Sequence, residues 1–337
     1  MYFIIDYMNY AKYAIADIHL HLDGSLSAKA IIDVAKKENL TLPTYNENEL
    51  IQYLEVPENC ESLNEYLKRF DLPNVALQSE YGIRYCTLDL LKRLADDGVK
   101  YTEIRMAPQL STLKGLSQED VVKVMISSLK EGEEKYGIRS NLILCMMRGN
   151  DTHEKNIETI EIAKKYYGDK VVALDLAGAE ALFPNELFEK EFALIKKYGL
   201  NLTIHAGEAS GAESVKSALR FGANRIGHGI HAIEDKNVVE LLKLSRICLE
   251  ICPKSNLDTK AINSYNELPI REFMKVGVKV SINSDDMTVS NTSVKKEYET
   301  LSKLEFSENE LKELCLNTIQ YSFADKDTKE YLKKFIL

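Results

Sequence analysis

Short apolar runs alternate with longer segments of helical period along this chain of 337 residues. The short runs are rich in β-branched and aliphatic residues. They predict eight strands, at residues 14–22, 100–106, 141–147, 170–178, 201–207, 225–229, 246–253 and 278–286. Apolar positions spaced by about 3.6 residues predict helices between most of them. These helices are expected at residues 121–136, 156–167, 187–198, 211–221 and 238–244.

Strands that alternate with helices indicate right-handed βαβ units and a parallel sheet. Eight such units in one chain predict an α/β fold of the (β/α)8 barrel type, formed by a single domain over residues 1–337. An open, doubly wound sheet is the alternative. The longest interruption, residues 26–99, holds several helical stretches and is predicted to be a helical insertion after the first strand.

The composition limits the cellular locations and the binding partners that are expected for this chain. The chain is 45% hydrophobic, which allows a sizeable core, and its net charge of −9 disfavours nucleic-acid binding. The N-terminus has no basic region, and Asp6 interrupts its apolar run, so no signal peptide is expected there. No uncharged apolar run is long enough to span a membrane. The six cysteines lie mostly in apolar segments, which indicates reduced, buried thiols and a cytoplasmic protein.

Polar residues gather where the predicted strands end. In chain order they are His19, His21, Asp23, His205, Glu208, His228, Asp285 and Asp286. Five of the six histidines of the chain lie at or just after such an end, His231 being the loosest fit. Since barrel enzymes place their chemistry at the carboxyl ends of the strands, this face is predicted to be the active one.

Two of these histidines are separated by one residue, which predicts a metal site. On a strand, His19 and His21 point to the same side. Burial for packing alone is the other interpretation of this pair, but His205 and Asp285 offer further donors at other strand ends. Three histidines and one carboxylate suit a borderline divalent ion, and one zinc per chain is predicted. Zinc lowers the pKa of a bound water to about 7, which makes hydroxide available at neutral pH.

Two further residues are predicted to handle protons. Glu208 follows His205 in HAGEASG, and the turn at Gly207 lets its carboxyl group return over the same face as a general acid or base. A glutamate placed in the first turn of a helix by the dipole is the structural alternative. His228, in RIGHGIH, is predicted to orient the hydroxide or accept its proton, with a buried core histidine as the alternative. His153 and His231 are interpreted as locally structural.

Six segments together carry a family resemblance. They are DIHLHLDGSL, DLAGAE, TIHAGEA, RIGHGIHAIED, ICPKSNLDT and LPIREFMKVGVKVSINSDDMTVSNT, which lie in order between residues 17 and 292. They resemble the adenosine deaminase family of the amidohydrolase superfamily. The histidine pair alone indicates only the superfamily, whereas the ordered combination of HLDGS, HAGE, GHG and SDD is specific. The resemblance implies a zinc-dependent hydrolase of purine salvage. Metal-bound hydroxide would attack purine C6 and convert adenosine, and 2′-deoxyadenosine, to inosine and ammonia.

The resemblance also assigns roles to single residues. The zinc ligands would be His19, His21, His205 and Asp285. Glu208 resembles the acid that protonates purine N1, and His228 resembles the residue that orients the attacking water and stabilises developing charge.

Four residues are implied to contact the substrate. His21 is one of them. Asp23 falls where the family contacts the ribose 5′-hydroxyl, Gly178 where it offers a backbone N–H to purine N3, and Asp286 where it meets purine N7.

The insertion holds a candidate lid. The segment SLNEYLKRF places four residues on one predicted helix face, namely Leu63, Tyr66, Leu67 and Phe70. This face resembles the family's apolar lid over the nucleoside, where exclusion of water strengthens polar contacts. An ordinary amphipathic helix packed on the core is the other interpretation.

The chain departs from the family pattern at two places. Ala179 stands in DLAGAE where an acidic residue is expected, and Met287 follows SDD where many relatives have proline. Both bear on the detail of the substrate pocket and not on the reaction class. The residues before Ala14 match no motif.

Three other functions are considered. A sister deaminase could act on adenine or on an N6-modified adenine nucleoside or nucleotide, but Asp23 and the lid favour a nucleoside, and no cationic phosphate site is evident. A zinc deaminase of nucleic acid would show H-x-E with P-C-x-x-C, which is absent. An inactive binding protein is disfavoured because Glu208, His228 and all the ligands are present. The expected partner is a small purine nucleoside, and the expected state is a monomer or weak homo-oligomer.

The two adjacent aspartates, Asp285 and Asp286, are expected to have different roles. Asp285 would be the ionised metal ligand and Asp286 would face the purine. Purine N7 and an ionised carboxylate are both acceptors only, so a hydrogen bond between them needs a proton. Burial and the neighbouring carboxylate would raise the pKa of Asp286, which predicts that it carries or shares that proton when substrate is bound.

Overall fold

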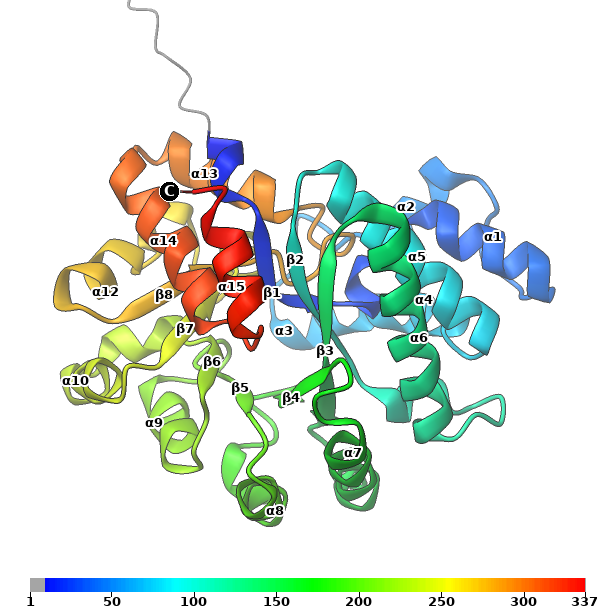
Figure 1. The fold of residues 1–337 in the computed structure, drawn as a ribbon, viewed down its shortest axis with the longest axis horizontal. Helices are drawn as coiled ribbons and strands as arrows, with labels where there is room; N and C mark the ends of the chain where they lie inside the picture. Colours follow the sequence, from blue (N-terminus) through cyan, green and yellow to red (C-terminus); the bar gives the residue numbers. More distant parts are fainter. Residues whose placement is uncertain (1–9, 337) are drawn as a thin grey trace, which may run out of the picture.

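Eight parallel strands form the centre of the computed structural model, which describes residues 10–336 (Figure 1). Each predicted strand is present within a few residues of its expected ends. The strands are β1 (Ala16–His21), β2 (Tyr101–Met106), β3 (Arg139–Met147), β4 (Val171–Ala177), β5 (Thr203–Ala206), β6 (Arg225–His228), β7 (Cys248–Ile251) and β8 (Lys279–Ile282). The expectation for the first nine residues lies outside the described part of the chain.

Backbone hydrogen bonds close these strands into a barrel. The strands pair in chain order as two four-stranded parallel sheets, β1 to β4 and β5 to β8. At one seam, Leu174 N donates to Asn201 O at 2.9 Å. At the other, His21 N donates to Asp285 O at 2.8 Å and Asp285 N donates to His19 O at 2.9 Å. The prediction of a (β/α)8 barrel is confirmed, and the open sheet is excluded.

Helices surround the barrel, and five of them lie where the 3.6-residue period predicts them. These are α6 (Gln118–Tyr136), α7 (His153–Tyr166), α8 (Glu189–Tyr198), α9 (Ala212–Arg220) and α10 (Lys236–Ser245), whereas α11 (Pro253–Asp258) and α12 (Ile270–Val276) were not predicted. The longest of them, α6, begins with a capping box between Ser117 and Asp120 and ends at Gly137, which has a φ of 68°. These local signals fix both ends of α6, the helix that connects β2 to β3.

Five helices lie between β1 and β2, where the insertion is expected. They are α1 (Ala28–Glu38), α2 (Glu47–Leu54), α3 (Leu63–Tyr66), α4 (Asp71–Ala76) and α5 (Glu80–Asp96). The prediction of one helix through the lid segment is wrong, because α3 ends at Tyr66 and the 3-10 turn η3 covers Leu67–Phe70. Pro73 has no N–H to donate, so one α-helix could not continue unbroken from α3 into α4.

Three helices at the C-terminal end complete the outer layer and were not predicted from the sequence. They are α13 (Val294–Lys303), α14 (Glu308–Tyr321) and α15 (Lys326–Lys333). A capping box between Ser307 and Glu310 starts α14. Asn317 Nδ2 then donates to Val280 O at 3.1 Å, which ties α14 to β8. In Figure 1 these helices lie over β8 and β1, next to the two termini of the described chain.

Short 3-10 turns connect many of these elements. They are η1 (Tyr10–Tyr13), η2 (Asp23–Ser25), η3, η4 (Pro108–Ser111), η5 (Asn185–Phe188), η6 (Ile230–Glu234) and η7 (Tyr265–Glu267). Three of them, η2, η4 and η6, follow strands β1, β2 and β6 and so lie on the carboxyl face of the barrel. This face therefore combines strand ends with tightly turned loops.

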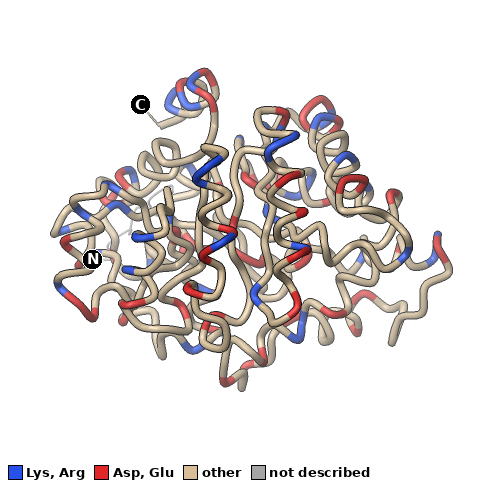
Figure 2. Tube along the Cα trace, turned by 90° about the horizontal axis from the view of Figure 1, so that it is seen from below, with Lys and Arg blue, Asp and Glu red and all other residues tan. Residues whose placement is uncertain are grey.

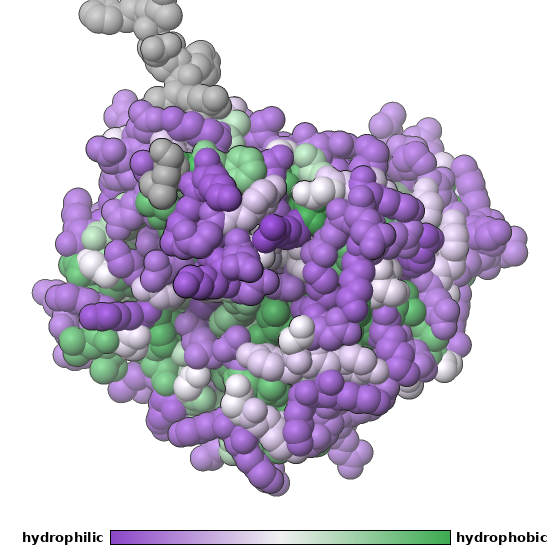
Figure 3. Space-filling model, in the orientation of Figure 1, coloured by the Kyte–Doolittle hydropathy of each residue, from purple (hydrophilic) through white to green (hydrophobic). Residues whose placement is uncertain are grey.

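The outer surface carries charges of both signs. Lys and Arg positions are interleaved with Asp and Glu positions along the outer helices (Figure 2), and the face seen in Figure 3 is mostly hydrophilic. All six cysteines are buried and unpaired, as expected. Within residues 10–336, no helix combines the length and apolar character that crossing a bilayer requires.

Candidate functional site

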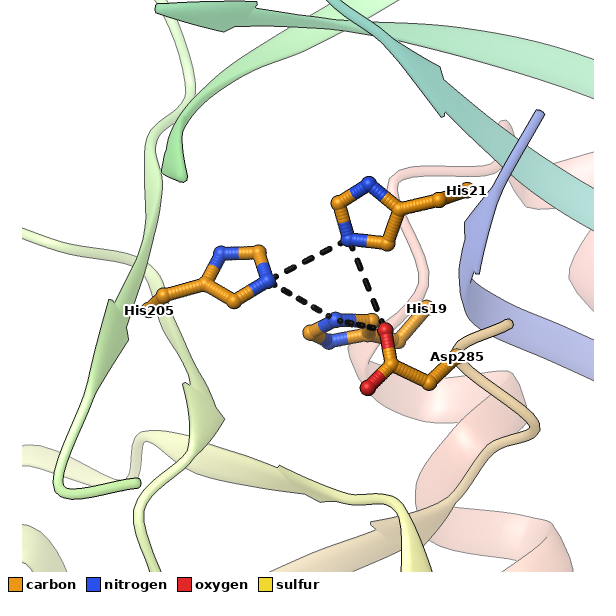
Figure 4. Close-up of side chains that lie close together, drawn as sticks. All are labelled: His19, His21, His205 and Asp285. Atoms are coloured by element: carbon orange, nitrogen blue, oxygen red, sulfur yellow. Dashed lines mark hydrogen bonds and ion pairs between the residues drawn. The ribbon is translucent and has the colours of Figure 1, made fainter. Parts of the chain in front are cut away.

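Four side chains from three places on the barrel converge at the carboxyl ends of the strands (Figure 4). His19 and His21 come from β1, His205 from β5, and Asp285 follows β8. His205 Nε2 lies 3.1 Å from His19 Nε2 and 3.2 Å from His21 Nε2. Asp285 Oδ1 lies 3.3 Å from His19 Nε2 and 3.5 Å from His21 Nε2.

This spacing fits one metal ion. The donor atoms of the four residues all lie within 4.8 Å of one another. An ion about 2.0–2.1 Å from each of four tetrahedral ligands would hold the ligand atoms about 3.3 Å apart. Burial lowers the pKa of His21 to about 3, which keeps its ring neutral as a metal ligand requires. Burial of Asp285 opposes its ionisation, but the neighbouring His19, His228 and His21 rings hold the pKa of Asp285 well below its usual range, so that carboxyl group is ionised.

Buried carboxylates behind the histidines fix their orientation. Glu250 Oε2 lies 2.7 Å from His19 Nδ1, and Asp175 Oδ2 lies 3.0 Å from His205 Nδ1. Arg105 bridges these two carboxylates, and all three of these charged side chains are fully buried. Since each carboxylate takes the Nδ1 side of its ring, each Nε2 is left to face the shared centre. Sequence reasoning missed these three residues, although charged residues inside apolar strands were a visible signal.

Two residues of the site have strained backbones. His228 has a φ of 60° and Asp285 has a φ of 62°, in the left-handed region that residues other than glycine rarely adopt. Such conformations cost about 1–3 kcal/mol each and persist at functional sites where the surrounding structure enforces them. The side chains of these two residues lie close together, with His228 Nε2 3.7 Å from Asp285 Oδ2.

Glu208 and His228 lie beside the four donors. His228 Nε2 is 3.5 Å from Glu208 Oε2 and 3.7 Å from Asp285 Oδ2. Asn256 Nδ2 donates to His228 Nδ1 at 3.0 Å, which leaves Nε2 facing the site. Burial lowers the pKa of His228 well below its ordinary value, so the ring is neutral. Burial and the Asp285 carboxylate raise the pKa of Glu208 well above its ordinary value, which favours the protonated form of Glu208.

Asp286 differs from its neighbour in both charge and surroundings. Burial and the charge of Asp285 raise the pKa of Asp286 well above its ordinary value, in the direction expected from the sequence. Its Oδ2 accepts from Tyr66 OH at 2.9 Å, whereas its Oδ1 is buried without a hydrogen-bond partner in the described structure. The two adjacent aspartates therefore have opposite pKa shifts and different contacts.

A cavity of about 350 Å³ opens above these residues. It is lined by polar residues of the strand ends and by apolar residues of the insertion and of strands β2 to β4. The residues predicted to contact substrate or metal that line it are His21, Asp23, Leu63, Tyr66, Leu67, Phe70, Gly178, His205, Glu208, His228, Asp285 and Asp286. His19 lies beneath them and is fully buried. A pocket of this size, with few convergent polar groups, suits a small organic molecule.

Comparison with known proteins identifies the family. The family model described as adenosine deaminase matches residues 15–336. The curated adenosine deaminase of Haemophilus ducreyi is 46% identical over 327 residues, which cover 96% of this chain and 95% of that protein. The chain belongs to the adenosine deaminase family.

Solved structures of related deaminases share the fold. Adenine deaminase from Arthrobacter aurescens aligns with a TM-score of 0.88 at 30% identity, over 96% of this chain and 98% of that chain. The N6-mAMP deaminase of Arabidopsis aligns with a TM-score of 0.84 at 25% identity, over 96% and 98% of the two chains. These neighbours act on different adenine compounds, so the barrel itself does not define the substrate.

In this member of the adenosine deaminase family, Glu180 holds the loop that carries Glu208. Its carboxylate accepts from the backbone N–H groups of residues 207, 208, 209 and 210, at distances between 2.7 and 3.2 Å. Its Oε1 also accepts from Ser214 OH at 2.5 Å. Glu180 was quoted in the motif DLAGAE but received no role from the sequence. The five contacts indicate that it fixes the path of the turn after β5.

Glu180→Gln should therefore displace Glu208 without removing it. The amide has one acceptor oxygen and places an NH2 group against backbone donors, so we expect the free energy of unfolding to fall by about 2–3 kcal/mol. We also expect kcat to fall about tenfold with the metal content unchanged. The control is Glu186→Gln, since Glu186 is a more exposed carboxylate that bonds Ser217 and Arg220 of α9. Equal effects of the two variants on kcat would contradict the assigned role of Glu180.

Gly24, in the motif HLDGS, lies against the Asp286 carboxyl group. A Cβ atom added at Gly24 would lie 1.7 Å from Asp286 Oδ1. Gly24→Ala should therefore push the Asp286 carboxyl group aside, and we expect KM for adenosine to rise about tenfold, because overpacking costs about 1–3 kcal/mol. Gly132→Ala is the control, since its Cβ would meet only the Leu91 side chain in the α5–α6 interface. A normal KM in Gly24→Ala protein would contradict this account.

The remaining predicted positions are readily located in the structure. Gly178 has a φ of 108°, which favours glycine at the end of β4. The departure Ala179 lines the cavity beside it, and Met287 is buried with its N–H donating to Ser25 Oγ at 3.0 Å. His153 and His231 have local partners, since their Nδ1 atoms lie 2.6 Å from Glu191 and 2.7 Å from Glu234.

A second group of possible metal donors lies beneath the first. It consists of His228, Cys252 and Asp285. Burial raises the pKa of the Cys252 thiol well above its ordinary value, and its Sγ donates to the Glu250 carbonyl at 3.5 Å. A protonated thiol engaged in this way is a poor ligand. This second group is therefore a weaker candidate for a metal site than the three histidines and Asp285.

Proposed function

We propose that this chain catalyses the hydrolytic deamination of adenosine to inosine and ammonia, and that 2′-deoxyadenosine is also a substrate. The chain is an enzyme of a metal-dependent amidohydrolase family, and its near-full-length relatives support adenosine as the substrate. The observation that carries the proposal is the convergence of four metal donors with Glu208 and His228 at the floor of one cavity.

We infer that His19, His21, His205 and Asp285 hold the metal, with zinc as the ion that three imidazoles and one carboxylate suit best. When bound, such an ion activates water at neutral pH. The protein's part is to present three ring nitrogens on one side and the ionised Asp285 on the other. Asp175 and Glu250 keep two of those rings turned toward the ion.

The remaining residues would bind and orient the purine. Protonated Glu208 would donate its proton to purine N1, which makes C6 more electrophilic. His228, held by Asn256, would orient the water that adds to C6 and stabilise the charge that develops there. The amino group would leave as ammonia, so one water is consumed for each inosine formed.

The other substrate contacts come from the cavity walls. We propose that Gly178 offers its N–H to N3, that Asp286 meets N7, that Asp23 contacts the ribose 5′-hydroxyl, and that His21 also contacts the substrate. Residues 26–99 would act as the helical part of a single domain, and their apolar side chains would cover the nucleoside and exclude water. These side chains are Leu63, Tyr66, Leu67 and Phe70.

The charge of the cavity favours a nucleoside over a nucleotide. Five carboxyl groups line it, from Asp23, Asp71, Glu208, Asp285 and Asp286. Among the described lining residues, Arg148 is the one lysine or arginine. Its Nη atoms donate to Phe183 O, Asn185 Oδ1 and His205 O. A phosphate group would therefore meet carboxyl groups and no available cation.

A panel of substrates tests this proposal. With protein of measured metal content, we expect kcat/KM for adenosine and 2′-deoxyadenosine to exceed that for adenine and N6-methyl-AMP by at least about 100-fold, roughly the discrimination that mismatched polar groups give. A preference for adenine or for N6-methyl-AMP would replace the proposal with the function of a structural neighbour. The expected environment is the cytoplasm, and the expected state is a monomer or weak homo-oligomer.

A further inference from the structure

The hydroxyl group of Tyr66 joins the helical insertion to the chain just after β8. It donates to Asp286 Oδ2 at 2.9 Å and lies 2.8 Å from Ser290 Oγ. Tyr66 is 2% exposed and Asp286 is 3% exposed, so the contact is shielded from water. A shielded hydrogen bond between these two parts of the chain couples the place of α3 to the orientation of one carboxyl group.

The two oxygens of that carboxyl group have unequal surroundings. Tyr66 takes Oδ2, whereas Oδ1 is buried against Gly24 and has no hydrogen-bond partner among the described residues. Asp286 also lines the cavity. Since a buried polar atom without a partner is unfavourable, Oδ1 is the oxygen that a bound ligand would satisfy.

The hydroxyl group is not needed to fill space. The Tyr66 ring packs with Cys60, Leu63 and Val289, and with the partly buried Leu67 and Phe70 beside them. A phenylalanine ring would fill the same place. The hydroxyl group therefore adds a directed contact to a face that apolar packing already covers.

We propose that Tyr66 is a positioning residue for substrate recognition and acts through its hydroxyl group. It turns Asp286 so that one oxygen meets N7 of the bound purine, and the same bond holds the insertion closed over the cavity. This inference rests on the proposed function, because it takes Asp286 as the residue that meets the purine. The inference means that a residue of the lid, Tyr66, contributes to the recognition of N7 together with Asp286.

Binding to metal-free protein tests the proposal without turnover. The dissociation constants of adenosine and of 7-deazaadenosine, which lacks N7, are measured calorimetrically with chelator-treated wild-type protein and Tyr66→Phe. Adenosine should bind about tenfold more weakly to the variant, the size expected when a hydrogen bond to a strongly polar group is lost. Binding of 7-deazaadenosine should change by less than about twofold. A merely structural role would weaken both ligands equally, and that result would overturn the proposal.

A double-mutant cycle with Asp286→Ala, which removes both the acceptor for Tyr66 and the contact to N7, provides the second measurement. If Tyr66 acts through Asp286, then Tyr66→Phe should weaken adenosine binding by less than about twofold in the Asp286→Ala background. An undiminished loss in that background would overturn the proposal. The control is Tyr85→Phe, whose hydroxyl group donates to Asp33 at 2.7 Å between α5 and α1 and does not line the cavity. It should leave adenosine binding unchanged.

Hydrogen exchange of the ligand-free protein tests the closure of the insertion. Peptides that cover residues 61–76 should exchange faster in Tyr66→Phe than in wild-type protein and in Tyr85→Phe. Unchanged exchange would overturn the closing role of the bond. These measurements require no catalysis, so a wild-type protein that failed to deaminate adenosine would refute the proposed function and would leave the role of Tyr66 to be decided by exchange and binding.

Discussion

Asp285→Asn should lose metal and activity together. Asp285 is the one carboxylate among the four donors, and its Oδ1 lies 3.3 Å from His19 Nε2 and 3.5 Å from His21 Nε2. The amide removes the negative charge that balances the ion, so the metal content after dialysis should fall. We expect kcat/KM for adenosine to fall by more than about 100-fold, beyond the usual loss when only a supporting partner of a metal ligand is removed.

Asp286→Asn is the matched variant, one residue further along the chain. The amide keeps a donor for N7 and leaves the four metal donors in place, so the metal content should stay normal and KM should rise only modestly. Metal analysis and steady-state kinetics on both variants test whether Asp285 binds the metal and Asp286 contacts the substrate. A normal metal content in Asp285→Asn, or loss of metal from Asp286→Asn, would show that the roles of the two aspartates are wrongly assigned.

Glu208→Gln should abolish most of the turnover while leaving the site assembled. The amide retains the size of the side chain but has no acidic proton to give to N1. We expect kcat to fall by about 10²–10⁴, the usual contribution of general acid–base catalysis. The metal content, and adenosine binding to chelator-treated protein, should stay within about twofold of the wild type. Loss of metal in this variant, or a kcat near the wild-type value, would contradict the role of Glu208 as the acid.

The carboxyl group of Glu208 also sets the direction in which activity changes with pH. Burial and Asp285 raise the pKa of Glu208 well above its ordinary value, so the acid form persists to higher pH than in an ordinary glutamic acid. Activity should fall as the pH rises through that raised pKa, because the acid that donates the proton is lost. The residual activity of Glu208→Gln should lack this alkaline decline. A decline of the same shape in both proteins would assign it to another group.

Much of the active face follows from local sequence patterns. The spacing of His19 and His21 places both on one side of a strand, and the strand ends of a barrel must meet on one face. The sequence therefore predicts that His205 and Asp285, which are far apart in the chain, lie near this pair, and they do. The glycine of the HLDGS motif also gains a physical reason, since any side chain at Gly24 would strike Asp286.

Other contacts depend on the packed structure and could not be read from one sequence. In the sequence, Tyr66 is one member of an apolar helix face. The hydrogen bond from its hydroxyl group to Asp286 exists only because α3 packs beside the chain that follows β8. Glu180 looks like an ordinary loop glutamate until its carboxylate meets four successive backbone N–H groups. The change from α3 to the 3-10 turn η3 after Tyr66 is likewise not visible in the period of the apolar positions.

Metal-dependent conversion of adenosine tests the central claim most directly. Inosine and ammonia are measured with purified protein of known metal content, then after treatment with a chelator, and again after zinc is returned. One inosine and one ammonia should form for each adenosine consumed, and the activity should disappear with the metal and return with zinc. Undiminished deamination by fully metal-free protein, or no deamination of adenosine by the metal-loaded protein, would contradict the account.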